Sequence, residues 1–103
     1  MQQQAVSTDE VAIDPNEWKE RLTKYCQDTG YWPSPQRTAV AMALGKHATY
    51  TDADTLWLSM RDQNSQVSRA TVYKALIWLV GAGLVHKKMD KVDGHRTALY
   101  AIR

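Results

Sequence analysis

The sequence predicts a mainly α-helical domain with a small β-hairpin, arranged as a winged helix-turn-helix of four helices followed by a two-stranded wing. Apolar residues recur at helical spacing in four segments, and each segment follows a capping residue. A weakly alternating stretch follows the last segment, and an Asp-Gly dipeptide typical of hairpin turns divides it. The chain has 103 residues, which suffices for one compact domain, and we expect that domain over residues 14–103.

The first helix begins at Asp14 and Pro15, because Asp suits the cap and Pro the first helical position. We expect it to end before Gly30, which favours a left-handed stop. Its predicted inward residues are Trp18, Leu22 and Tyr25.

Ser34 and Pro35 repeat this start signal for a second helix that runs to about Lys46. Thr51 or Asp52 opens the third helix. The predicted inward residues of the two helices are Val40, Ala43 and Leu44, and Ala53, Leu56, Trp57 and Met60.

Ser68 begins the fourth helix after a polar turn, and the glycines 81 and 83 mark its close. Its predicted buried stripe is Val72, Ala75, Leu76, Leu79 and Val80. Residues 84–89 then form a strand, Asp93-Gly94 a turn, and residues 98–102 the return strand.

Residues 1–13 are polar, Gln-rich and without periodicity, which predicts a flexible tail. They lack the basic start and apolar segment of a signal peptide, and no apolar run approaches the roughly 20 residues of a membrane helix. The single cysteine, Cys26, excludes an intrachain disulfide. We expect a cytoplasmic protein with no membrane partner.

Basic residues concentrate in the C-terminal part of the chain. Residues 66–103 contain seven Lys and Arg against two Asp, a net charge of +5, whereas residues 1–65 carry −3. This distribution favours a polyanion partner, with a solvated basic face as the alternative. In a winged helix, the start of the fourth helix projects from the surface of the domain. The major groove of DNA is about 12 Å wide and admits one such helix. Double-stranded DNA is therefore the expected partner.

The stretch SRATVYKAL, residues 68–76, carries the candidate contacts of that helix. Its predicted outward residues are Ser68, Arg69, Thr71, Tyr73 and Lys74. Hydroxyls at a helix N-terminus suit phosphate oxygens. Lys74 can reach guanine acceptors, and Tyr73 can contact a thymine methyl group. The alternatives are that Ser68 only caps the helix and that Tyr73 packs as a half-buried residue. On the wing, the residues expected against the phosphate backbone are Lys87, Lys88, Lys91 and Arg96.

Two apolar residues, Ile77 and Trp78, lie where the fourth helix turns away from the core. One interpretation is that Trp78 packs against the wing or the first helix. The other is that both residues contact a partner or a second copy, since Trp is enriched at interfaces. The second interpretation gives an alternative function, a winged-helix protein-interaction module or adaptor.

Four short motifs occur in order: PQR at 35–37, DADTLW at 52–57, ATVYKAL at 70–76 and GLVHK at 83–87. With them, the chain resembles the DNA-binding winged-helix domain of the ferric uptake regulator family, including its zinc-uptake branch, over about residues 22–102. The resemblance implies a sequence-specific transcriptional regulator of bacterial or phage type.

The resemblance also implies residue roles. Arg37 would contact phosphate, Thr71 would contact the DNA backbone, and Tyr73 and Lys74 would face bases. The family usually has Arg where this chain has Lys74, and Lys lacks the planar fork that reads guanine with two bonds.

Family members continue into a second domain that binds metal and forms the dimer, whereas this sequence ends just after the predicted wing. We therefore expect the DNA-binding domain without that second domain, and with no metal or cofactor. The sequence shows no set of catalytic residues, so we also expect no enzymatic activity. The histidines and the cysteine, His47, His86, His95 and Cys26, have no zinc-site spacing. A homodimer, or a complex with another regulator, would then need a different contact surface, for which Ile77 and Trp78 are the candidate residues.

Overall fold

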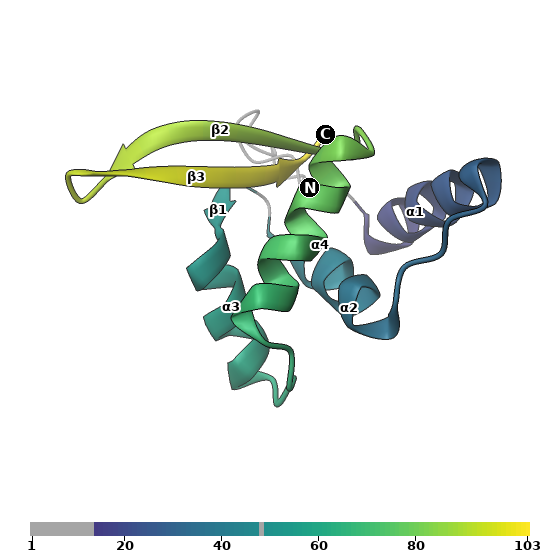
Figure 1. Ribbon diagram of the computed structural model, residues 1–103, viewed down its shortest axis with the longest axis horizontal. Helices are drawn as coiled ribbons and strands as arrows, with labels where there is room; N and C mark the ends of the chain where they lie inside the picture. Colours follow the sequence, from purple (N-terminus) through teal and green to yellow (C-terminus); the bar gives the residue numbers. More distant parts are fainter. Residues whose placement is uncertain (1–13, 48) are drawn as a thin grey trace, which may run out of the picture.

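The computed structural model describes residues 14–47 and 49–103, and the predicted tail over residues 1–13 lies outside them. Its elements are α1 (Pro15–Thr29), α2 (Pro35–Leu44), β1 (Thr51–Asp52), α3 (Ala53–Asp62), α4 (Arg69–Gly81), β2 (Val85–Val92) and β3 (His95–Ile102) (Figure 1). The predicted winged helix-turn-helix is confirmed, with its four helices and closing hairpin in the predicted order.

Both ends of α1 agree with the sequence signals. The Asp14 carboxylate accepts a hydrogen bond from the backbone N–H of Asn16 at 2.9 Å, and Pro15 is the first helical residue. Gly30 follows the helix with a φ of 76°, the left-handed conformation that glycine adopts without strain. Its N–H donates to the Cys26 carbonyl oxygen and closes the last turn.

Trp18 joins α1 to α2. Its side chain is buried, and its indole Nε1 donates to the carbonyl oxygen of Ala41 at 2.8 Å. The helix α2 ends at Leu44, short of the predicted Lys46. Gly45 follows, and a Cβ atom there would lie 2.5 Å from Cδ1 of the Trp18 ring. The buried ring therefore requires a glycine at this point.

The helices α3 and α4 form the helix-turn-helix. Asp52 caps α3 and Ser68 caps α4, each through its side-chain oxygen. The indole Nε1 of Trp57 donates to the Val67 carbonyl oxygen at 3.0 Å, which ties α3 to the residue before the α4 cap. The start of α4 is thus held by a side chain from the preceding helix.

The sheet has three strands, in the order β1-β3-β2, rather than the two of the predicted wing. The added strand β1 pairs with β3 through Thr51 opposite Tyr100 and Asp52 opposite Leu99. Two residues are too few to show the alternation that indicates a strand in sequence. The pairing connects the base of the wing to the cap of α3.

The hairpin strands extend three residues nearer the turn than predicted, to Val92 and His95. The turn residues Asp93 and Gly94 both have positive φ, at 52° and 82°. This conformation matches the twist of the flanking strands and lets the ladder continue to the turn. The wing therefore reaches beyond the helices, on the side of the molecule opposite α1 (Figure 1).

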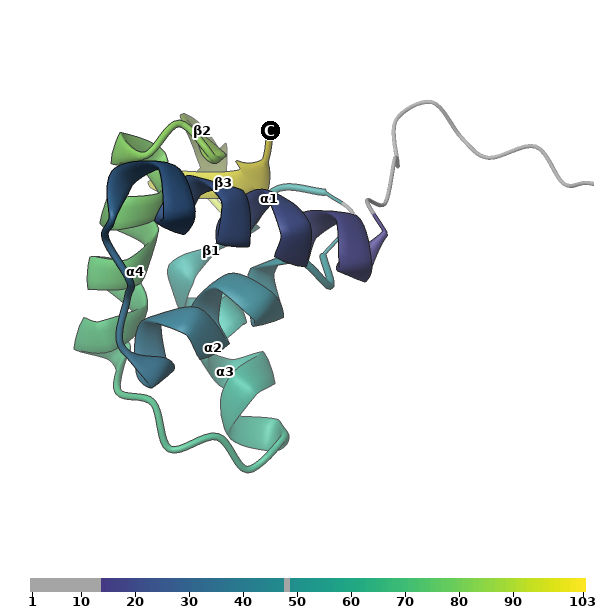
Figure 2. The same cartoon turned by 90° about the vertical axis from the view of Figure 1, so that its right-hand side faces the viewer.

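The core lies between the helices and one face of the sheet. Figure 2 shows α2 between α1 and α3, with α4 along one side. The largest fully buried side chains are Trp18, Val40, Leu44, Leu56, Val72, Leu76, Leu79 and Val85. In residues 14–47 and 49–103, no helix is long and apolar enough to cross a membrane.

Candidate nucleic-acid interface

The N-terminal end of α4 presents two hydroxyl groups. The Ser68 hydroxyl oxygen accepts from the Thr71 backbone N–H at 3.1 Å, and the two side-chain oxygens lie 3.0 Å apart. Ser68 is exposed and Thr71 is half-buried. Ser68 therefore caps the helix, and its hydroxyl stays at the surface beside the positive end of the helix dipole.

Tyr73 and Lys74 lie on the exposed side of α4, opposite the buried Val72, Ala75 and Leu76. The Tyr73 side chain is 45% exposed, so about half of it is open to solvent and half is packed. Within the part of the chain that the structure describes, no carboxylate lies within 4.0 Å of the Lys74 ammonium. This face offers one aromatic ring and one unpaired cation.

A polar hollow separates the N-terminal ends of α2 and α4. Its lining is Ser34, Gln36, Arg37, Gln66, Val67, Ser68, Thr71 and Lys74. The Arg37 guanidinium is fixed by donating to the Tyr31 hydroxyl at 2.7 Å. Two helix N-termini, one guanidinium and one ammonium make the hollow electropositive and suited to an anion.

Arg69, the first residue of α4, is engaged within the fold. Its guanidinium carbon lies 4.6 Å from the centroid of the Trp57 ring, and its Nε lies 4.0 Å from a carboxylate oxygen of Asp54. Arg61 also lies over Trp57, at 5.1 Å. The Arg69 side chain nevertheless remains 59% exposed, which leaves part of it at the surface.

The predicted wing residues lie on two different faces. Cross-strand partners share a face and successive residues alternate. Lys87 pairs with the buried Tyr100, and Lys91 pairs with Arg96, which places these side chains on the face that continues from the core. Lys88 lies on the opposite face, where its ammonium is 4.2 Å from the centroid of the Tyr50 ring. Of the predicted basic residues of the wing, Lys87, Lys91 and Arg96 therefore lie on the core side of the sheet, and Lys88 does not.

A second polar hollow brings Arg96 close to Tyr73. Its lining is Asp52, Ala53, Asp54, Tyr73, Arg96, Thr97, Ala98 and Tyr100. Burial raises the pKa of Tyr100, and the nearby Tyr73 phenol raises it further, in keeping with this proximity. The exposed side of α4 and one face of the wing thus border one continuous surface.

Ile77 and Trp78 have different environments. Ile77 is 66% exposed, whereas Trp78 is half-buried. The Trp78 ring packs edge-on against the Tyr25 ring, with 6.0 Å between the ring centroids. It is tilted by 50° against the Tyr31 ring, with 5.5 Å between the centroids. Trp78 therefore packs against the first helix, as one interpretation of the sequence anticipates.

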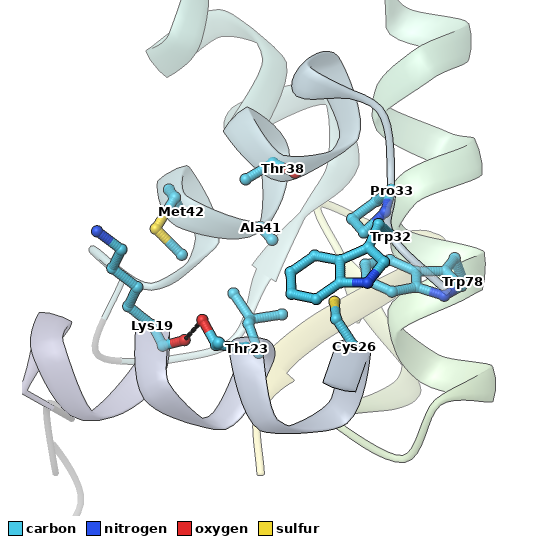
Figure 3. Close-up of a pocket in the computed structure, with 10 residues that line it drawn as sticks. Lys19, Thr23, Cys26, Trp32, Pro33, Thr38, Ala41, Met42 and Trp78 are labelled. Carbon is cyan, nitrogen blue, oxygen red and sulfur yellow. Dashed lines mark hydrogen bonds between the residues drawn. The ribbon is translucent and has the colours of Figure 1, made fainter. Parts of the chain in front are cut away.

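Trp78 also borders a small apolar pocket of about 140 Å³ between α1 and α2 (Figure 3). Trp32 lies over this pocket from the segment between α1 and α2, and the Cys26 sulfur lies below it (Figure 3). Burial raises the pKa of the Cys26 thiol, which keeps it neutral. Among residues 14–47 and 49–103, no three His, Cys, Asp or Glu side chains gather as metal ligands would.

Neither the contacts of Trp57 with the start of α4 nor the convergence of Ser34 and Ser68 at one hollow is predicted from the sequence. The two caps are visible in the sequence as Ser-Pro and Ser-Arg helix starts. Their proximity depends on the packing of α2 against α4, for which the sequence carries no local signal.

The four helices, the hairpin and the exposed helix of this surface define a winged helix-turn-helix protein. The sequence matches the ferric uptake regulator family over residues 28–99, well over half of the chain. The chain therefore belongs to that family, as the four motifs indicate.

Solved structures of regulators share the fold. PerR from Streptococcus pyogenes, described in terms of peroxide sensing and gene regulation, aligns with a TM-score of 0.69 and 21% identity over 93% of this chain and 62% of its own. Fur from Helicobacter pylori aligns with a TM-score of 0.68 and 21% identity, over 88% of this chain and 59% of its own. Fur from Vibrio cholerae aligns with a TM-score of 0.64 and 19% identity, over 80% of this chain and 61% of its own. Its structure is described as revealing a rearrangement of the DNA-binding domains. This chain thus spans less than two thirds of each, and no curated protein matches it.

Proposed function

We propose that this domain binds duplex DNA as a sequence-specific transcriptional regulator, with the N-terminal half of α4 in the major groove. Tyr73 and Lys74 are adjacent, exposed and on one side of the helix. A lysine in the major groove can donate to guanine O6 and N7, and an aromatic edge can contact the thymine methyl group. These two side chains would carry the base contacts.

Phosphate contacts would come from the hollow between α2 and α4. Arg37, Ser68 and Thr71 border it, and the two helix N-termini direct positive partial charge into it. On the wing, Lys87, Lys91 and Arg96 would face the backbone. Lys88 lies on the other face and would contribute only through its long-range charge.

The observation that carries this proposal is that Lys74 lines the anion-suited hollow and also lies beside the exposed Tyr73. The groups proposed to bind phosphate and the side chains proposed to contact bases therefore adjoin at the start of α4. A partner surface made of Ile77 and Trp78 together has less support, because the Trp78 ring packs against Tyr25 and Tyr31.

The test is binding to fluorescently labelled duplex DNA, first a random-sequence pool and then a selected site, at several salt concentrations. We expect the logarithm of the association constant to fall linearly with the logarithm of salt concentration, as counterion release requires. Lys74→Ala should weaken binding about tenfold or more, because hydrogen bonds to charged groups contribute about 1.5–3 kcal/mol.

Lys19→Ala is the matched control, since it removes the same charge from α1, away from this surface. It should leave affinity for the selected site within about twofold, as an exposed charge far from the contacts does. Salt-independent binding, or equal losses for the Lys74 and Lys19 variants, would refute the proposal.

A further inference from the structure

Ile77 continues the exposed stripe of α4. Ala70, Tyr73, Lys74 and Ile77 are spaced i, i+3, i+4 and i+7, which places them on one face of a helix, and all four are exposed. At 66% exposure, Ile77 is the most exposed large hydrophobic side chain in residues 14–47 and 49–103. An apolar side chain on this face would add one apolar contact to whatever α4 binds.

The surroundings of Ile77 disfavour a second copy of the chain as that partner. A stable protein interface buries about 800 Å² on each side around an apolar centre. Here the flanking residues on the stripe are Lys74 and Gly81, and the neighbouring Trp78 is turned into the fold. A second copy that packs through the same face would also bring its own Lys74 next to Lys74 of the first copy.

Duplex DNA offers both an apolar contact for Ile77 and a negative charge for the basic residue of this face. The phosphates of DNA would neutralise Lys74, which lies beside Ile77 on the stripe, and the floor of the major groove offers one apolar group, the C5-methyl of thymine. We infer that Ile77 contacts a thymine methyl group and so favours thymine over cytosine at one position of the bound site. This inference rests on the proposed binding of α4 in the major groove and extends the contacts one helix turn beyond its N-terminal half.

The affected position follows from helix geometry. With a rise of about 1.5 Å per residue, Ile77 lies about 4.5–6 Å along α4 from Lys74 and Tyr73. Base pairs are stacked about 3.4 Å apart, so the thymine lies within about two base pairs of the bases near those two residues. Ile77 would therefore set the sequence preference on the side of the site nearest the C-terminal end of α4.

The test uses deoxyuridine, which lacks only the methyl group of thymine. Each thymine of a site selected from random duplexes is replaced singly, and affinity is measured by fluorescence polarisation for the wild-type protein and for Ile77→Ala. The wild-type protein should lose about fourfold at one thymine, since a buried methyl group contributes about 0.8 kcal/mol. For Ile77→Ala that loss should disappear, and its affinity for the thymine duplex should itself be about fourfold lower.

Leu58→Ala is the matched control, because Leu58 is an exposed apolar residue on α3, outside this face. It should keep the full thymine effect. The inference fails if Ile77→Ala weakens thymine and deoxyuridine duplexes equally, or if Tyr73→Ala removes the effect at that thymine and Ile77→Ala does not.

Two further outcomes also overturn it. Conversion of a dimer to a monomer by Ile77→Ala, with the thymine effect unchanged, would assign the residue to a second copy. Absence of salt-dependent duplex binding by the wild-type protein would remove the proposed function and the inference together. Loss of the thymine effect alone leaves the proposed function standing, so the two failures are distinguishable.

Discussion

The guanidinium carbon of Arg69 lies 4.6 Å from the centroid of the Trp57 ring, so a cation–π contact holds the first residue of α4 against α3. The same indole donates to the Val67 carbonyl oxygen at 3.0 Å. Trp57 thus fixes the chain on both sides of the Ser68 cap. Trp57 therefore helps the Ser68 cap to hold the start of α4, where the proposed phosphate contacts lie.

Replacing Trp57 should therefore destabilise the domain. Trp57→Leu removes one hydrogen bond, worth about 1 kcal/mol, and the stacking of two arginines, worth about 0.5–1 kcal/mol each. We expect the free energy of unfolding in urea to fall by about 2–3 kcal/mol. Trp57→Phe keeps a ring for the arginines and should lose about half as much. An equal loss for both variants would show that the ring does not hold the arginines.

Gly45 should resist substitution because of the Trp18 ring. A Cβ at Gly45 would meet Trp18 at 2.5 Å, and the buried ring is held by its bond to Ala41. Gly45→Ala should lower the free energy of unfolding by about 1–3 kcal/mol, the usual cost of overpacking. Gly81→Ala is the control, since a Cβ there meets nothing within 4 Å and the residue is helical. Its stability should be unchanged or higher by up to about 1 kcal/mol.

The cap of α3 should give a pH-dependent stability. Partial burial alone would raise the pKa of Asp52, but hydrogen bonds from the Thr55 hydroxyl and backbone N–H outweigh it and lower the pKa. A lowered pKa means that the folded state favours the carboxylate, so this stabilisation is present above about pH 4 and is lost as the pH falls through the folded-state value.

Asp52→Ala should accordingly cost about 1 kcal/mol at pH 7, and the difference from wild type should shrink at pH 3. Urea unfolding at the two pH values measures both. Asp28→Ala removes an exposed carboxylate paired with Lys24 and should change stability little at either pH. A difference for Asp52→Ala that stays constant down to pH 3 would contradict a charged cap.

Arg37 should act on the salt dependence of DNA binding more than on sequence preference. A phosphate contact releases about 0.9 counterion, so Arg37→Ala should reduce the slope of log affinity against log salt by about 1 and weaken all duplexes alike. Tyr31→Phe removes the hydroxyl that accepts from Arg37 and should produce a smaller loss of the same kind. A selective loss for one sequence would instead place Arg37 at a base.

Local sequence signals predicted the helix ends because each depends on neighbouring residues only. Asp14, Ser34 and Ser68 cap by bonds to backbone groups two or three residues away. The Asp93-Gly94 turn is equally local, and it accounts for the hairpin. The exposed side of α4 followed from the spacing of its apolar residues.

The features that the sequence did not predict are contacts between residues far apart in the chain. The pairing of Thr51 with Tyr100 spans half the chain and created a third strand. The separation of Lys88 from Lys87 and Lys91 depends on strand register, which composition does not reveal. The environment of Trp78 depends on Tyr25 and Tyr31, so the sequence left it open between packing and a partner contact.

Deaza-purine duplexes can show whether α4 enters the major groove with Lys74 against the bases. Replacing purines of the selected site by 7-deaza analogues removes only major-groove N7 acceptors, whereas 3-deazaadenine removes a minor-groove acceptor. We predict that wild-type affinity falls about tenfold with the 7-deaza site, as for a lost charged hydrogen bond, and is unchanged with 3-deazaadenine. Lys74→Ala should bind the natural and 7-deaza sites equally. Sensitivity to 3-deazaadenine with none to the 7-deaza purines would show that α4 does not bind in the major groove.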